Sequence, residues 1–251
     1  MKAYSDDELG DLAKALNLMA EKLEEIQLLR RELVANVSHE LSTPLTSIRG
    51  YLEALHDGVI KGKKRAETLV LLRDEAERLV SMVEDVKKLA VIERSGLELE
   101  LEKVDLGQAL DSVSQRMEVQ ATERGVKLNI EVKGEIPLVP ADAKRLEQIL
   151  INLISNAVKF SDRGKEVKLI LENTADGVLL KVEDQGVGIS RRDLPYVFER
   201  FYRADKSRSR ETGGTGIGLA IVKELVDAHG WRIEVESELG VGTCFKLAFI
   251  V

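Results

Sequence analysis

Residues 142–160, DAKRLEQILINLISNAVKF, are the stretch of the chain that decides its fold. Apolar residues recur in it every three or four positions, the spacing that places them along one side of an α-helix. Asp142 precedes this pattern and follows Pro140, where a short polar side chain can cap the first turn of a helix. The stretch therefore predicts an amphipathic helix whose apolar side is buried against another layer.

The opposite side of this helix carries Asn152, Asn156 and Lys159, which project within about 60° of one another. Asparagine is a mediocre helix former, so two asparagines one turn apart require an explanation. They form either a solvated polar face or neutral oxygen ligands for a hard cation such as Mg²⁺, with Lys159 beside a phosphate. Both interpretations stay open on the sequence of the helix alone.

Strands and further helices are predicted around this helix. Strand-like alternation occurs at residues 97–104, 126–132, 167–171, 178–182, 233–237 and 244–250. Helical spacing recurs at residues 106–124 and 217–228, and Gly230 suits a left-handed position after the second of these helices. Because strands and helices do not alternate as βαβ units, the pattern predicts an α+β sandwich. The polar residues 190–215 are expected to form a lid, with a short helix near residues 194–202.

The first third of the chain has a different period. From residue 5 to about residue 37, apolar residues alternate three and four positions apart, a heptad pattern typical of coiled coils. The same signal returns at residues 69–90, and the glycines within residues 57–62 predict a turn between two helices. The expected antiparallel hairpin has an apolar face wide enough to require a dimer that forms a four-helix bundle. Arg30 interrupts the heptads as a stutter, which is expected to let the first helix switch between two packings.

The composition narrows the classes of function. The chain has 251 residues, of which 44% are hydrophobic and 32% are charged, so it can bury a sizeable core. Cys244 is its only cysteine, which excludes an intramolecular disulfide and any multi-cysteine zinc site. The net charge of -7 argues against nonspecific nucleic-acid binding. Because the sequence has neither a membrane-spanning apolar run nor a signal peptide, a soluble protein of a reducing compartment is expected.

A histidine on the first helix is a candidate nucleophile. His39 is expected on the solvent side of the helix, with Glu40 beside it and Thr43 one turn further on. A lone exposed histidine is usually an ordinary surface residue. The alternative is a nucleophile whose proton passes to Glu40. Pro44 removes a backbone hydrogen bond from this helix, so a bend is expected there.

Two glycine clusters suggest a nucleotide site. Residues 184–188, DQGVG, follow a predicted strand, and the Asp184 carboxylate can accept a hydrogen bond from an exocyclic amine while the glycines let the backbone approach a ligand. Residues 213–219, GGTGIGL, lead into a helix whose first N–H groups favour phosphate. Neither cluster matches the dinucleotide fingerprint or a Walker loop. Each cluster alone is equally well explained as turn chemistry.

Taken together and in this order, the motifs resemble the cytoplasmic part of a bacterial two-component sensor histidine kinase. Residues 38–45 resemble the phosphoacceptor box, and residues 152–160 resemble the N box. The two glycine boxes and the F box are similar to residues 184–188, 214–219 and 198–203. The closing G-x-G-T element is similar to residues 240–243, and residues 7–10 with the heptads after them resemble the second helix of a HAMP relay.

This resemblance implies a dimeric antiparallel helical hairpin followed by an α/β sandwich of the histidine kinase/gyrase ATPase type. The implied domains are a HAMP-like signalling helix at 1–29, a dimerisation and phosphotransfer hairpin at 30–95, and a catalytic ATP-binding domain at 96–251. The implied activity is autophosphorylation of His39 by ATP with Mg²⁺, followed by transfer to an aspartate of a response regulator receiver domain. Glu40 would assist the kinase reaction and Thr43 the dephosphorylation of the partner.

The resemblance also assigns the nucleotide site and the partners. The implied metal ligands are Asn152 and Asn156. The implied nucleotide-binding residues are Asn152, Asn156, Lys159, Phe160, Asp184, Gly186, Gly188, Ile189, Arg203, Gly214, Thr215, Gly216, Ile217, Gly218, Leu219 and Thr243. The expected partners are a second copy of the chain and the receiver domain, without nucleic acid. The chain is expected to be the cytoplasmic portion of a cell-membrane protein, with the membrane sensor region outside this sequence.

Two residues depart from the family pattern, and two other functions compete with the kinase. Ser42 stands where the family usually has arginine, and Trp231 stands where it often has a second glycine, so this ring is expected to cover either a sheet edge or a domain contact. A gyrase-like ATPase clamp that the coiled coil merely dimerises is one alternative, and a scaffold with a degenerate nucleotide pocket is the other. The helical hairpin that carries His39 favours the kinase.

Overall fold

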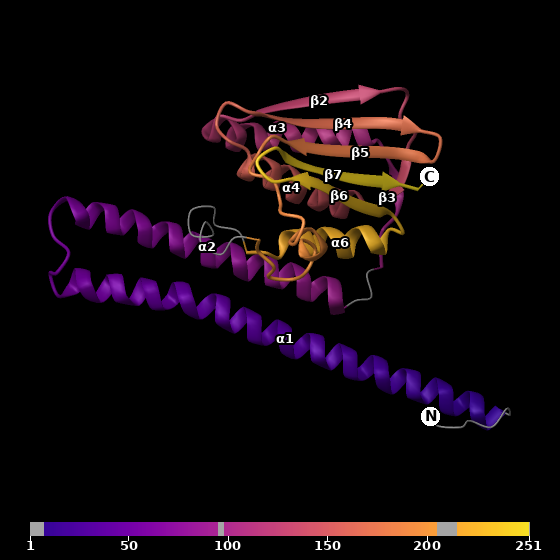
Figure 1. Ribbon diagram of the computed structural model, residues 1–251, viewed down its shortest axis with the longest axis horizontal. Coiled ribbons are helices and arrows are strands. Elements are labelled where there is room, and N and C mark those ends of the chain that lie inside the picture. The colour runs from indigo at the N-terminus through magenta and orange to yellow at the C-terminus, as the bar shows by residue number, and fades with distance from the viewer. Residues whose placement is uncertain (1–7, 95–97, 205–214, 251) are drawn as a thin grey trace. The chain divides into compact units, whose positions relative to one another are not determined.

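The computed structural model describes residues 8–94, 98–204 and 215–250 (Figure 1). It divides into two compact units, a helical unit at Met1–Leu79 and an α/β unit at Val80–Val251. Two long helices open the chain, α1 at Glu8–His56 and α2 at Lys63–Arg94. Gly58 and Gly62, with φ of 68° and 62°, lie in the turn between them, so the predicted helix–turn–helix order is confirmed.

The apolar stripes of the helical unit are exposed in the single chain. About half or more of the surface of these side chains is accessible: Leu12, Leu16, Leu23, Leu45, Leu52 and Leu69. A helix that is apolar on one side requires another surface to cover that side. The side chain of Arg30 lies outside the described residues, so the expected stutter there stays a prediction.

The helix α1 continues through Pro44. Proline supplies no N–H, which removes the usual bond to the carbonyl four residues earlier. Hydroxyl groups before and after the proline hydrogen-bond to helix carbonyls, with Ser42 Oγ donating to Ser38 O at 2.7 Å and Thr46 Oγ1 to Ser42 O at 2.8 Å. The helix is therefore continuous across the proline, and the bend expected there stays a prediction.

A five-stranded sheet forms the centre of the α/β unit, with the strand order β2-β4-β5-β7-β6. Its strands are β2 at Lys127–Lys133, β4 at Glu166–Thr174, β5 at Gly177–Asp184, β6 at Arg232–Glu238 and β7 at Gly242–Phe249. The β2–β4 pair is parallel, and the other pairs are antiparallel. A separate pair joins β1 at Glu102–Val104 to β3 at Val139–Ala141. The predicted strand at 97–104 is thus three residues long within the described chain, and β3 was not predicted.

Three helices cover one face of this sheet, α3 at Leu106–Arg124, α4 at Ala143–Phe160 and α6 at Gly218–Ala228 (Figure 1). The apolar side of α4 is fully buried, including Leu146, Ile149 and Leu153. Asp142 caps α4 by accepting a hydrogen bond from the Arg145 N–H. The predicted α+β sandwich is confirmed, with α4 at the middle of its helical layer.

Trp231 is buried inside this unit and stays only 6% exposed. Its ring stacks on His229 at 4.1 Å between centroids and meets the Phe249 ring edge-on at 4.7 Å. Gly230 has a φ of 71°, the left-handed conformation that the sequence predicts after α6. The ring therefore packs into the core between the end of α6 and β7, so the expectation that it covers a sheet edge or a domain contact is wrong.

Candidate functional site

The residues predicted to form the phosphoacceptor site lie on α1 in the helical unit. The side chains of His39 and Thr43 are exposed, as the helical spacing predicts, and Glu40 is half-buried. Thr43 Oγ1 lies 3.3 Å from the carbonyl oxygen of His39 and donates a hydrogen bond to it. The hydroxyl therefore has a local helical role in this state, and its two lone pairs remain able to accept hydrogen bonds.

Asp184 ends β5 and is 9% exposed. Its Oδ1 accepts two backbone hydrogen bonds, from Gly186 N at 2.9 Å and from Thr243 N at 3.2 Å. Among the described residues no donor reaches its Oδ2. Burial raises the pKa of Asp184, and the two N–H donors act in the opposite direction. One oxygen is thus held by the protein, while the other can meet a ligand that donates a hydrogen bond.

The glycines after Asp184 are required by close packing of the protein on itself. A Cβ on Gly186 would lie 2.0 Å from the carbonyl oxygen of Phe160, and one on Gly188 would lie 2.0 Å from that of Glu238. Gly188 also has a φ of 66°. The sequence suggested that these glycines make room for a ligand, but the structure gives a different reason: this loop is wedged between the end of α4 and the end of β6.

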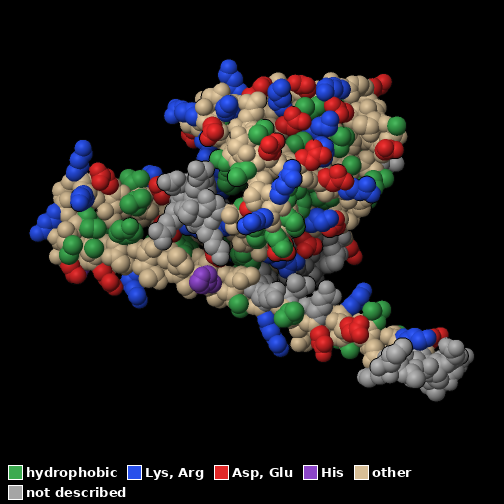
Figure 2. All heavy atoms as spheres, viewed as in Figure 1, with side chains coloured by type: hydrophobic (Ala, Val, Ile, Leu, Met, Phe, Trp, Pro, Cys, Tyr) green, Lys and Arg blue, Asp and Glu red, His purple; other side chains and the backbone are tan. Residues whose placement is uncertain are grey.

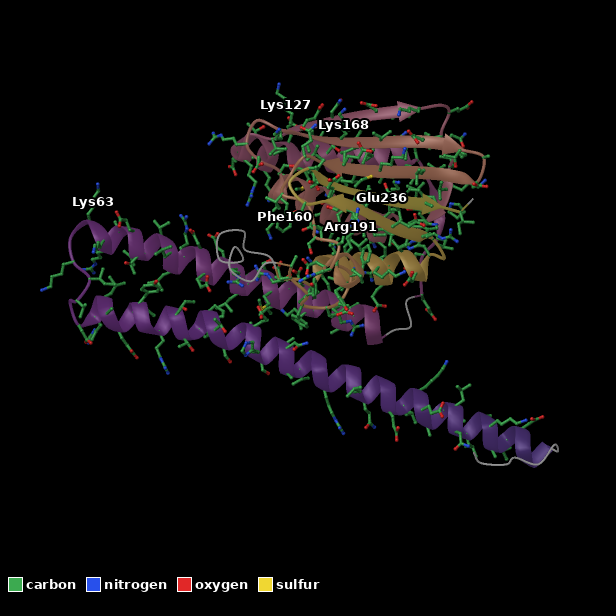
Figure 3. The ribbon with its side chains drawn as sticks, in the orientation of Figure 1. Lys63, Lys127, Phe160, Lys168, Arg191 and Glu236 are labelled. Carbon is green, nitrogen blue, oxygen red and sulfur yellow. The ribbon has the colours of Figure 1, made fainter. Side chains whose placement is uncertain are left out.

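The polar side of α4 faces the start of α6. Asn152 Nδ2 donates to the carbonyl oxygen of Gly218 at 3.1 Å, which fixes the orientation of the amide, and Asn152 Oδ1 accepts no hydrogen bond from the described residues. Asn156 and Lys159 are half-buried on the same side. Phe160, labelled in Figure 3, is 41% exposed, and Lys159 Nζ lies 5.2 Å from the centre of its ring. These residues therefore gather next to the loop after Asp184.

The second glycine cluster enters α6 beside the F box. Gly214 lies outside the described residues, while Thr215 and Ile217 are buried, and Leu219 and Gly218 are half-buried. Gly216, with a φ of 71°, accepts a hydrogen bond at its carbonyl from Phe201 N at 2.9 Å. A Cβ on Gly216 would lie 2.9 Å from Tyr202 O. The F box, within the expected lid, thus contacts the residue that follows the lid.

The described part of the expected lid has less helix than predicted. Only residues Leu194–Tyr196 form a short 3₁₀ turn. Asp193 joins the segment by accepting hydrogen bonds from Ser190 Oγ at 2.7 Å and from the Tyr202 hydroxyl. The bonds from Tyr202 and Ser190 lower the pKa of Asp193, and the bond to Asp193, together with burial, raises the pKa of Tyr202 to about 12. Arg203 is half-buried just beyond Tyr202.

The sequence analysis missed one residue beside the site, Ser237. Ser237 Oγ accepts a hydrogen bond from Ile189 N at 2.8 Å and lies 2.9 Å from Thr243 Oγ1. A serine near the end of a strand carries no signal in the sequence, because only the pairing of β6 with β7 brings it beside Thr243.

On the face drawn in Figure 2, acidic and basic side chains are interspersed over the described part of the α/β unit.

Two family models match the chain. Residues 141–250 match the histidine kinase-, DNA gyrase B- and HSP90-like ATPase family, and residues 29–95 match the His Kinase A (phospho-acceptor) domain. The sensor histidine kinase WalK of Bacillus subtilis is 40% identical over 217 residues, which are 85% of this chain and 35% of that protein. The chain spans about a third to a half of the length of the relatives it matches.

Solved structures agree with these matches. The Acinetobacter baumannii histidine kinase AdeS has a TM-score of 0.66 and 29% identity, over 84% of this chain and 97% of that chain. Full-length ShkA in complex with AMPPNP has a TM-score of 0.61 and 33% identity, over 88% of this chain and 46% of that chain. Within the residues that the structure describes, no helix is long and apolar enough to cross a membrane. The chain belongs to the sensor histidine kinase family, and it carries both the phospho-acceptor domain and the ATPase domain of that family.

Proposed function

We propose that the chain is the kinase core of a two-component sensor: it phosphorylates His39 with ATP and passes the phosphoryl group to an aspartate of a response regulator. One observation carries this proposal, namely that a phospho-acceptor model and an ATPase model match consecutive parts of one chain. A gyrase-like ATPase clamp has no need of an acceptor histidine. We retain the domain bounds 1–29, 30–95 and 96–251 as part of the proposal.

The carboxylate of Asp184, of which only one oxygen accepts hydrogen bonds from the described residues, supports adenine as the base. Its Oδ1 is held by two backbone N–H groups, and its Oδ2, which no donor among the described residues reaches, can accept a hydrogen bond from the exocyclic amine. A donor placed there favours the charged carboxylate, whose pKa burial raises. Ile189 lies in the loop after Asp184, and Phe160 lies at the adjoining end of α4. Both side chains would contact the base.

The polar side of α4 fits Mg²⁺ and phosphate. The Asn152 amide is oriented by its bond to Gly218 O, which leaves Oδ1 as a neutral oxygen ligand, and Asn156 follows one turn later. Mg²⁺ prefers oxygen ligands and is usually held by a few protein groups together with substrate phosphates. Lys159 and Arg203 would meet phosphate oxygens, and the backbone of residues 214–219 would surround them.

In the transfer step, an imidazole nitrogen of His39 attacks the γ-phosphorus, and the bond from that phosphorus to the ADP oxygen breaks. The imidazole proton passes to Glu40, the neighbouring carboxylate. Transfer onward breaks the phosphorus–nitrogen bond and forms a bond to an aspartate oxygen of the receiver domain. Thr43 would assist the reverse activity by holding a water beside the phospho-aspartate through its free lone pairs.

The exposed apolar stripes of the helical unit support a homodimer built on a four-helix bundle. Relatives named as sensor kinases support a place at the membrane for the whole protein. In that protein, a sensor region would connect to the helical bundle of this chain. In this proposal the first helix transmits the signal.

Incubation of the chain with Mg²⁺ and [γ-³²P]ATP tests the proposal. Acid-labile label on the protein is expected, and it is absent from His39→Gln. His56→Gln is the matched control, because His56 is an exposed histidine in the last turn of the same helix. Release of labelled phosphate without label on the wild-type protein would instead indicate a simple ATPase.

A further inference from the structure

Ser237, Thr243 and Asp184 form one row across three adjacent strands. Thr243 on β7 pairs with Ser237 on β6 on one side and with Asp184 on β5 on the other. Directly paired residues of antiparallel strands project from the same face of a sheet. The row therefore connects a serine to the carboxylate proposed to bind adenine.

The hydroxyl of Ser237 is fully used by the protein. A serine hydroxyl has one hydrogen and two lone pairs. The Gly242 carbonyl at 2.8 Å can only accept, so Ser237 donates its hydrogen there. The Ile189 N–H at 2.8 Å can only donate, so it takes one lone pair. The contact of 2.9 Å to Thr243 Oγ1 must then have Thr243 as the donor.

This arrangement fixes the hydrogen-bond character of Thr243. Its hydroxyl hydrogen is committed to Ser237, so Thr243 Oγ1 can offer only lone pairs to any other group. Its backbone N–H is committed to Asp184 Oδ1. The free capacity of the row, at Asp184 Oδ2 and Thr243 Oγ1, consists of acceptors alone. An amino group donates hydrogen bonds to such acceptors. A keto oxygen in the same place would face other oxygens with no hydrogen between them.

We propose that Ser237 is a positioning residue that sets the base preference of the nucleotide site: by holding the Thr243 hydroxyl as an acceptor, it favours a purine with an amino group at C6 over one with a keto group. This inference rests on the proposed function, because it takes Asp184 as the residue that meets the base. Ser237 is not needed for the pairing of β6 with β7, since the strands are paired over seven residues by their backbones.

The ratio of the dissociation constants for ITP and ATP in the presence of Mg²⁺ tests this role. Inosine triphosphate has a keto oxygen where ATP has the amine. Ser237→Ala frees the Thr243 hydroxyl to rotate and donate to the keto oxygen, so the ratio is expected to fall about tenfold, the equivalent of one neutral hydrogen bond. Ser237→Thr restores the hydroxyl and is expected to restore the ratio. Thr174→Val is the matched control, because it removes a hydroxyl-to-carbonyl bond at the far end of the same sheet.

The outcomes separate this inference from the function on which it rests. A ratio that falls in Asp184→Asn and stays at the wild-type value in Ser237→Ala would overturn the role of Ser237 and leave the adenine site standing. A ratio that is unchanged in Asp184→Asn would overturn the adenine assignment itself. Equal losses of affinity for both nucleotides in Ser237→Ala, without rescue by threonine, would show a merely structural serine and would also overturn the inference.

Discussion

His229→Ala is expected to lower the free energy of unfolding of the α/β unit by about 3 kcal/mol. His229 Nε2 accepts a hydrogen bond from Asp142 N at 3.1 Å, and Nδ1 donates to Leu225 O at 2.7 Å, so the neutral ring carries its hydrogen on Nδ1. Each of these bonds contributes about 1 kcal/mol, and the stack on Trp231 contributes about 1 kcal/mol more. The truncated side chain loses all three contacts.

Urea unfolding at pH 7.5 measures this loss. Trp231 is the only tryptophan of the chain and is buried in this unit, so its fluorescence reports the unfolding directly. His229→Phe keeps a ring over Trp231 and loses both hydrogen bonds, so it is expected to lie between the wild type and the alanine variant. A loss below about 1 kcal/mol in His229→Ala would refute the assigned contacts.

The same residue predicts how stability depends on pH. Burial lowers the pKa of His229 below its ordinary value of 6.5, while the backbone bond to Leu225 and the Asp142 carboxylate act in the opposite direction. Because the folded state holds the ring neutral, its contribution is complete above the unfolded pKa and is lost as the pH falls through the folded pKa. Wild-type stability should therefore decline below about pH 6.5 more steeply than that of His229→Phe. Parallel pH profiles would contradict this.

Three further outcomes are expected. Gly186→Ala should abolish nucleotide binding, measured by calorimetry, because its methyl group would collide with the carbonyl oxygen at the end of α4; retained affinity would mean that the loop can move aside. Thr43→Ala should keep autophosphorylation and lose dephosphorylation of the phosphorylated receiver, while Glu40→Ala should mainly lose autophosphorylation; equal loss of both activities in Thr43→Ala would point to damage of the helix near Pro44. Leu79→Asp with Val83→Asp should make the chain monomeric by light scattering, since each buried charge costs several kcal/mol, and a persistent dimer would exclude this seam.

The sequence predicted the fold well where one period extends over many residues. The helix α4 was predicted within one residue, because its apolar spacing and the Asp142 cap agree. The strand β3 was missed because it has three residues, one of them Pro140, and only its pairing with β1 defines it. The limits of β5, β6 and β7 differ from the predicted ones by one or two residues, whereas β4 ends three residues later than predicted and β1 begins five residues later.

For the candidate site, residue types predicted which segments gather but not what each group touches. Asp184 and Asn152 do lie on adjoining elements, yet the bond from Asn152 to Gly218 O depends on the packing of α4 against α6. A glycine is required at position 188 because a Cβ there would collide with a backbone carbonyl of the protein. Trp231 is buried in the core. Such contacts join residues far apart in the chain, so no local pattern contains them.

The low reactivity of Cys244 allows another position of the chain to be labelled selectively, so that changes of distance can be measured. The thiol is half-buried in β7, and burial, with Glu183 nearby, raises its pKa to about 11. The thiolate is the reactive form, and an ordinary exposed cysteine has a pKa of about 8.5, so at neutral pH Cys244 holds a few hundred-fold less thiolate. A cysteine introduced at the exposed Ala204 should therefore take a maleimide dye or spin label selectively in the otherwise native sequence. Paired with a second label on α1, it would test whether the distance between the two units changes when ATP is added.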